Sequence, residues 1–143
     1  YIDVLATDHA PHTLDEKLAP YLKSPSGGPL VQHSLSALLT SFHKNRISLE
    51  KIIEKACHNP SILFDIKDRG FIREGFFADL VIIDLEKNYS VKKTNILYKC
   101  GWSPFENETF KGIVEKTFVN GHLAYNKGKI STKIAGKALA FRR

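Results

Sequence analysis

The chain has 143 residues, 43% of them hydrophobic and 25% charged, with a formal net charge of +6 at pH 7. These values are ordinary for a globular protein and exclude wholesale disorder, and the length suits one domain or parts of two. No apolar run approaches the length of a membrane span, so no membrane partner is expected. The start is apolar without the features of a signal peptide, and the chain has no methionine, which predicts a piece of a longer protein.

The basic charge could indicate a nucleic-acid partner. However, the lysines and arginines are scattered, and the adjacent basic pairs are Lys92–Lys93 and Arg142–Arg143. No basic stripe interleaved with aromatic residues is present to contact phosphates, so we expect no nucleic-acid binding. The two cysteines, Cys57 and Cys100, form no CxxC pair and predict two free, buried thiols in a reducing cytoplasm.

The N-terminal residues predict a short buried strand over 2–7, because they are mostly apolar. A polar cluster follows over 8–13. Residues 14–28 hold two prolines and the pair Gly27–Gly28, which predicts a loop.

Two helices are expected next. The first begins near Pro29, a residue favoured at the first helical position, and its apolar residues up to Phe42 fall on one helical face. The second begins after Ser48, which can cap it, and ends at Asn59–Pro60. One further turn is expected over 61–64.

The sequence pattern changes after Asp65. Residues 70–75 predict a turn, a short strand and a second turn, and residues 131–143 predict a tail. Asn120–Gly121 is a strong two-residue hairpin signal, because both positions tolerate positive φ. Three further strands are expected, over residues 79–84, 114–119 and 122–125.

The chain therefore divides near residue 65 into two unlike parts. One strand followed by helices cannot bury a sheet face alone, but it fits as the last repeat of a (β/α) barrel. The predicted fold class is α/β. Residues 1–65 would supply the end of a (β/α)8 TIM-type barrel, and residues 66–143 strands of a small β-sandwich domain and the tail.

The cluster Asp8-His9-Ala10-Pro11-His12 directly follows the predicted first strand. In a (β/α) barrel this is the face where catalytic groups gather. A carboxylate at Asp8 can bind a divalent metal and move a proton, and an imidazole at His12 can hold an anionic group of a substrate. The alternative is a polar loop in which Asp8 caps a helix and His12 is solvated, and the pattern alone leaves both open.

Metal sites of hydrolytic enzymes need three or more protein ligands and an open position. The sequence contains neither HxH nor HExxH, so the chain can hold only part of such a site. Four further histidines are interpreted as structural or surface residues: His33, His43, His58 and His122.

The stretch from Thr7 to Thr13, Thr-Asp-His-Ala-Pro-His-Thr, followed by Glu16-Lys17, resembles the final catalytic motif of the dihydroorotases in the amidohydrolase superfamily. Downstream stretches extend the resemblance over nearly the whole chain. They are Ser26-Gly27-Gly28-Pro29, like the family's substrate loop, residues 59–82, like the passage out of the barrel, and residues 103–121, like the C-terminal stretch.

The resemblance implies a zinc-dependent enzyme of pyrimidine biosynthesis that interconverts N-carbamoyl-L-aspartate and L-dihydroorotate. Asp8 would be the last metal ligand and would carry a proton from the attacking water to the leaving nitrogen. His12 would bind the substrate carboxylate, and the backbone near Gly27 and Gly28 would contact the ring, since glycine permits close approach. His9 is assigned a structural role or the role of orienting the metal-binding carboxylate.

The family's HxH pair and its remaining metal and substrate ligands are expected upstream of Tyr1. The chain alone is therefore expected to be inactive, and to fold poorly or pair with other chains, including as a homo-oligomer, through an open sheet edge. Two other functions remain open. One is a cyclic amidohydrolase acting on hydantoins or dihydropyrimidines, whose neutral rings offer His12 no carboxylate. The other is a catalytically inactive dihydroorotase-like scaffold that binds a partner enzyme.

Overall fold

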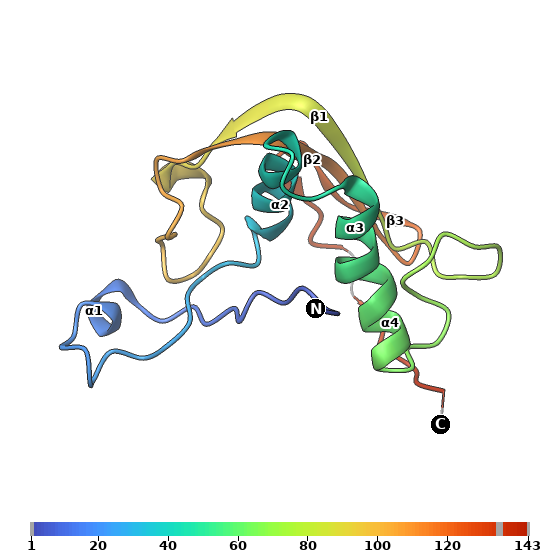
Figure 1. The fold of residues 1–143 in the computed structure, drawn as a ribbon, viewed down its shortest axis with the longest axis horizontal. Helices are drawn as coiled ribbons and strands as arrows, with labels where there is room; N and C mark the ends of the chain where they lie inside the picture. Colours follow the sequence, from blue (N-terminus) through green and yellow to red (C-terminus); the bar gives the residue numbers. More distant parts are fainter. Residues whose placement is uncertain (1, 134–135, 143) are drawn as a thin grey trace.

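The computed structural model describes residues 2–133 and 136–142 (Figure 1). The predicted tail, 131–143, lies partly outside these residues. The helices are α1 (Leu14–Lys17), α2 (Ser34–His43), α3 (Leu49–Ile53), the π-helix η1 (Glu54–His58), α4 (Asn59–Leu63) and the 3-10 helix η2 (Lys93–Asn95). The strands are β1 (Leu80–Ser90), β2 (Thr109–Val119), β3 (His122–Asn126) and β4 (Lys129–Ile130). The mixed α/β content is as predicted.

The strands form one antiparallel sheet in the order β1-β2-β3-β4. Asn120 and Gly121 turn the chain between β2 and β3 with φ of 50° and 81°, so the predicted hairpin is confirmed. The three predicted strands are also confirmed, but β1 and β2 are longer than expected. The extra residues mix polar and apolar types without regular alternation, and a register shift between Asp84 and Asn88 interrupts the pairing there.

The two halves of the chain share a core, because α2 packs under the sheet that arches over it (Figure 1). Leu39 of α2 is 1% exposed and lies against Gly112 of β2. A Cβ at Gly112 would stand 2.7 Å from the Leu39 Cβ, and φ there is +94°. Only glycine fits this backbone and this approach, so the position of α2 on the sheet depends on it.

The predicted helix end at Asn59–Pro60 is wrong, since helical structure runs without a break from Leu49 to Leu63. Proline lacks an N–H and its ring crowds the carbonyl four residues earlier, which normally ends or kinks an α-helix. Here the turn before it widens into the π-helix, in which the Asn59 N–H donates to the Glu54 carbonyl. Pro60 is thereby accommodated inside the helix.

Residues 2–7 do not form the predicted strand, although they are extended. The segment lies instead against the continuous helical stretch from Leu49 to Leu63. The Leu5 N–H donates to the Lys55 carbonyl at 3.0 Å, and the Asn59 side-chain amide donates to the Asp3 carbonyl at 2.6 Å. A strand needs a neighbour to pair with, and the described residues supply none to this segment.

The structure corrects three local expectations. The short helix α1 lies inside the predicted loop, since Thr13 and Glu16 form a capping box. The helix expected from Pro29 begins only at Ser34. Residues 70–75 form turns without a strand, with positive φ at both glycines.

The tail does not hang free, because it returns to the end of α4. Phe141 pairs with Ile66 in an isolated antiparallel bridge, and the Lys67 N–H donates to the Ala140 carbonyl at 2.8 Å. The two cysteines are free as predicted, but Cys57 is exposed and Cys100 partly exposed, so their predicted burial is wrong. No helix among the described residues is long and apolar enough to cross a bilayer.

Candidate functional site

The loop that carries Asp8 lies against the Gly27–Gly28 loop. His9 and Gly28 form an isolated parallel bridge, and the Ala10 N–H donates to the Gly28 carbonyl at 2.9 Å. Asp8 is exposed and has a positive φ of 46°. The bridge therefore presents the Asp8 carboxylate at the junction of two loops that are 20 residues apart in sequence.

At this junction Gly27 has no room for a side chain. Its φ is +76°, and a Cβ there would stand 2.7 Å from the Ala10 Cβ and 3.3 Å from Oδ2 of Asp8. A Cβ at Gly28 would meet nothing within 4 Å. The backbone of Gly27 thus borders the carboxylate directly, whereas Gly28 contributes through its carbonyl.

His9 holds the two loops together and does not offer both ring nitrogens to a ligand. Its Nδ1 accepts from the backbone N–H of Leu30 at 3.1 Å and from that of Val31 at 3.4 Å. Its ring lies on Tyr98, with 5.3 Å between centroids. An Nδ1 that accepts leaves the proton of the neutral ring on Nε2.

His12 keeps its ring accessible, with 38% of the side chain exposed. Its Nδ1 lies 3.8 Å from the Glu16 carboxylate. Hydrogen bonds from the Thr13 backbone and then its hydroxyl lower the pKa of Glu16, which stays ionised. An accessible imidazole can bind an anionic group through a ring N–H.

Lys17 is a site residue for which the sequence analysis proposed no role. Its half-buried ammonium donates to the carbonyls of Pro25 at 2.5 Å and Gly27 at 3.0 Å. The Ser24 hydroxyl donates to the Lys17 carbonyl at 3.2 Å. Lys17 therefore ties α1 to the glycine loop, and the signal that could have found it was its place in the motif.

A segment of the second half of the chain, residues 95–105, also reaches the site and was missed. The Gln32 side chain accepts from the Leu97 N–H and donates to the Asn95 carbonyl, both at 2.8 Å. The Tyr98 hydroxyl accepts from the Gln32 N–H at 2.8 Å. The Trp102 indole N–H donates to the His12 carbonyl at 2.8 Å. These contacts join residues far apart in sequence and leave no local pattern.

His33 is structural, as interpreted from the sequence. It is 0% exposed, its Nδ1 lies 3.1 Å from the Ser103 hydroxyl, and Phe105 packs edge-on against its ring. Burial lowers the pKa of His33, so the ring is held neutral. Its Nε2 is buried and finds no hydrogen-bond partner among the described residues, which costs free energy.

No group of three or more His, Cys, Asp or Glu side chains within residues 2–133 and 136–142 could hold a metal ion. Asp8 is a single candidate ligand. It lies beside a glycine whose missing side chain leaves its carboxylate unobstructed, so it fits as one member of a larger ligand set.

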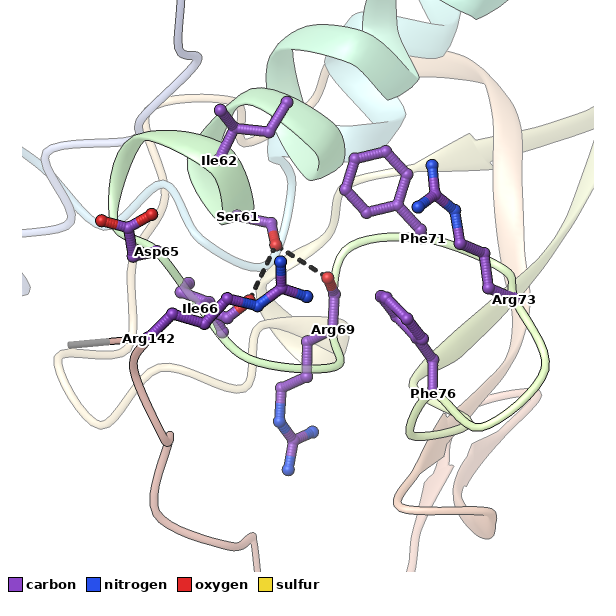
Figure 2. Close-up of a pocket in the computed structure, with 9 residues that line it drawn as sticks. All are labelled: Ser61, Ile62, Asp65, Ile66, Arg69, Phe71, Arg73, Phe76 and Arg142. Atoms are coloured by element: carbon purple, nitrogen blue, oxygen red, sulfur yellow. Dashed lines mark hydrogen bonds between the residues drawn. The ribbon is translucent and has the colours of Figure 1, made fainter.

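A cavity of about 320 Å³ lies elsewhere, between α4, residues 65–76 and the tail (Figure 2). Its polar groups are largely committed to the fold. The Ser61 hydroxyl donates to the Arg69 carbonyl at 2.7 Å, Arg69 itself pairs with Asp79, and the Arg73 guanidinium lies 4.5 Å from the Phe71 ring centre. The cavity shares no residue with the Asp8 loop, so its size does not make it the reaction site.

The family model described as Amidohydrolase family matches residues 2–124. The chain is 37% identical over 130 residues to the multifunctional protein pyr1-3 of Dictyostelium discoideum, covering 91% of this chain and 5% of that protein. It is 39% identical over 126 residues to a dihydroorotase of Clostridioides difficile, covering 87% and 29%. The chain thus spans less than a third of the length of either relative.

Solved structures share the fold. An L-hydantoinase (dihydropyrimidinase) from Arthrobacter aurescens matches with a TM-score of 0.82 and 29% identity, over 91% of this chain and 30% of that one. An inactive dihydroorotase-like domain from a CAD-like multifunctional protein of Chaetomium thermophilum matches with a TM-score of 0.62 and 23% identity, over 87% and 33%.

Proposed function

Since the chain belongs to the amidohydrolase family, we propose that it acts within a dihydroorotase, which interconverts N-carbamoyl-L-aspartate and L-dihydroorotate in pyrimidine biosynthesis. The observation that carries the proposal is the junction of the Asp8 and Gly27–Gly28 loops beside an accessible His12. In this proposal Asp8 would be the proton carrier, the backbone of the glycine loop would border the substrate, and His12 would bind its anionic group. The dihydroorotases among the relatives support the choice of substrate.

Asp8 would carry the proton of the reaction. In the hydrolytic direction a bond forms between water oxygen and the ring carbonyl carbon, and the bond from that carbon to nitrogen breaks. A carboxylate can take the water proton and give it to the departing nitrogen, and in ring closure it would move the proton the other way. The exposure of Asp8 leaves it free to reach both atoms.

His12 would select a substrate that carries a carboxylate. Its ring is accessible, and its Nδ1 lies 3.8 Å from the Glu16 carboxylate. A charge-assisted hydrogen bond to a carboxylate is stronger than a neutral one. The backbone of Gly27 and Gly28 would border the ring of the bound substrate, since the absent side chains permit close approach.

Zinc is the metal that we propose for this site, with Asp8 as its ligand in this chain. Zinc sites of hydrolases use three or more protein ligands, so the others would come from the part of the relatives' length that this chain does not span. When bound, the metal would activate water and polarise the carbonyl group.

We further propose that residues 1–65 complete a (β/α)8 TIM-type barrel and that residues 66–143 belong to a small β-sandwich domain with its tail. The extended segment 2–7 keeps most of its backbone groups available for a neighbouring barrel strand. β1 lies at the edge of the sheet, with Val81 and Ile82 about half exposed, and would pair with further strands or a second copy of the protein. The two free cysteines suit the cytoplasm.

A second candidate function is hydrolysis of hydantoins or dihydropyrimidines, which the fold of the Arthrobacter enzyme favours. The protein that contains this chain, purified with zinc, should be assayed for ring opening of dihydroorotate, hydantoin and dihydrouracil. If the protein is a dihydroorotase, it should turn over dihydroorotate. D8N should lose this turnover, and H12A should raise the KM. Turnover of hydantoin or dihydrouracil alone would support the second candidate function, and turnover of none of the three substrates would favour a non-catalytic scaffold.

A further inference from the structure

Trp102 connects the second half of the chain to the proposed substrate-binding residue. It lies in the connection between η2 and β2, and its indole N–H donates to the His12 carbonyl at 2.8 Å across 90 residues of sequence. The His12 N–H also donates to the Ala10 carbonyl at 2.9 Å. His12 belongs to no helix or strand, so these bonds help to fix the course of its backbone.

The indole can act as a fixed support because the residue after it is anchored in the core. Ser103 is 5% exposed, and its hydroxyl lies 3.1 Å from Nδ1 of the fully buried His33. The Phe105 N–H donates to the same hydroxyl at 3.2 Å. A neutral His33 and a tight turn thus hold Trp102 from one side.

The segment is also held before Trp102, through Tyr98. Its hydroxyl accepts from the Gln32 N–H at 2.8 Å, and its ring lies under His9. The segment 95–105 therefore contacts the loop of residues 8–13 at two points. Tyr98 packs against the His9 ring, and Trp102 donates a hydrogen bond to the His12 carbonyl.

We propose that Trp102 is a positioning residue that acts through His12. Its indole N–H fixes the His12 carbonyl, which fixes the direction in which the imidazole leaves the backbone toward the substrate carboxylate. This inference rests on the proposed function. In this inference the orientation of the His12 imidazole depends on segment 95–105, which lies outside the proposed barrel part, residues 1–65. The packing of residues 1–65 against residues 66–143 would therefore influence substrate affinity.

The test is a double-mutant cycle in the full protein with W102F, H12A and W102F/H12A. W102F keeps an aromatic ring and removes the N–H. It should raise KM about three- to tenfold, the range for loss of one neutral hydrogen bond, with kcat within about twofold. In the H12A background W102F should add little, because residues that act through one another are not additive. An equal rise in KM with and without His12 would overturn the inference.

A readout without substrate separates this inference from the proposed function. In W102F the NMR signals of the His12 ring should shift, whereas F105L, which alters the core packing beside Trp102 and leaves its N–H in place, should move them much less. An unshifted His12 signal in W102F contradicts the positioning role even if the enzyme is active. A wild-type protein that does not turn over dihydroorotate contradicts the proposed function even if the signal shifts.

Discussion

The loops around Asp8 and the hairpin of β2 and β3 are held in different ways. The hairpin has a repeating ladder of backbone bonds, and the core beside it includes Leu39 and Phe110. The loops rest on single contacts from side chains to backbone, such as those of His9 and Lys17, and on positive φ at Gly27. A region built on single contacts can lose its geometry without losing the fold. The site should therefore be sensitive in activity, and the core in stability.

The largest expected effect is a loss of turnover without a loss of stability, caused by a substitution in the loops around Asp8. D8N should reduce turnover about 10²- to 10⁴-fold, since an amide cannot carry the proton. The fold should persist, because asparagine tolerates the positive φ of 46° as readily as aspartate. Steady-state kinetics and thermal unfolding of the full protein would check both parts. Normal turnover in D8N would remove Asp8 from the mechanism.

The converse change lies in the core. L39A should lower the free energy of unfolding by about 2–5 kcal/mol, because it opens a cavity where α2 meets the sheet. L22A, at a leucine that is 95% exposed, is the matched control and should change little. Denaturant unfolding of the full protein measures both. Equal effects would mean that the docking of α2 contributes little to stability.

A smaller effect is expected where Lys17 supports the glycine loop. K17M keeps most of the length of the side chain but removes both bonds to the Pro25 and Gly27 carbonyls. The loss of bonds from a charged donor should weaken substrate binding by about 1.5–3 kcal/mol, seen as a raised KM. K17R should retain part of the substrate binding that K17M loses. K23M, at an exposed lysine six residues on, should leave KM unchanged. A KM unchanged in K17M would show that the loop holds its shape without Lys17.

The smallest effect is a dependence of stability on pH. Burial lowers the pKa of His33 below its unfolded value, so the unfolded state binds the proton more readily. Stability from this group should be complete above the ordinary histidine pKa of about 6.5 and decline as the pH falls below it. Denaturant unfolding between pH 7.5 and 5.5, about one unit either side of that pKa, should show this slope. H33N cannot titrate in this range and should flatten the slope of stability against pH. A slope in H33N identical to that of the wild type would assign the pH dependence to other groups.

The sequence alone predicted the features whose causes are local. Asn120–Gly121 makes a hairpin because both residues accept positive φ, and the apolar runs beside it can only be strands. Ser48 caps α3 because its hydroxyl reaches the Lys51 N–H three residues on. The motif at Asp8 was also visible in the sequence, but its contact with the glycine loop was not predicted.

Tertiary structure decided the features that depend on distant neighbours. Residues 2–7 look like a strand, but a strand exists only where another segment pairs with it. The bond from Trp102 to His12 joins residues 90 apart, and neither has a neighbour in sequence that signals the other. Such contacts follow from how α2 docks on the sheet, which no local periodicity encodes.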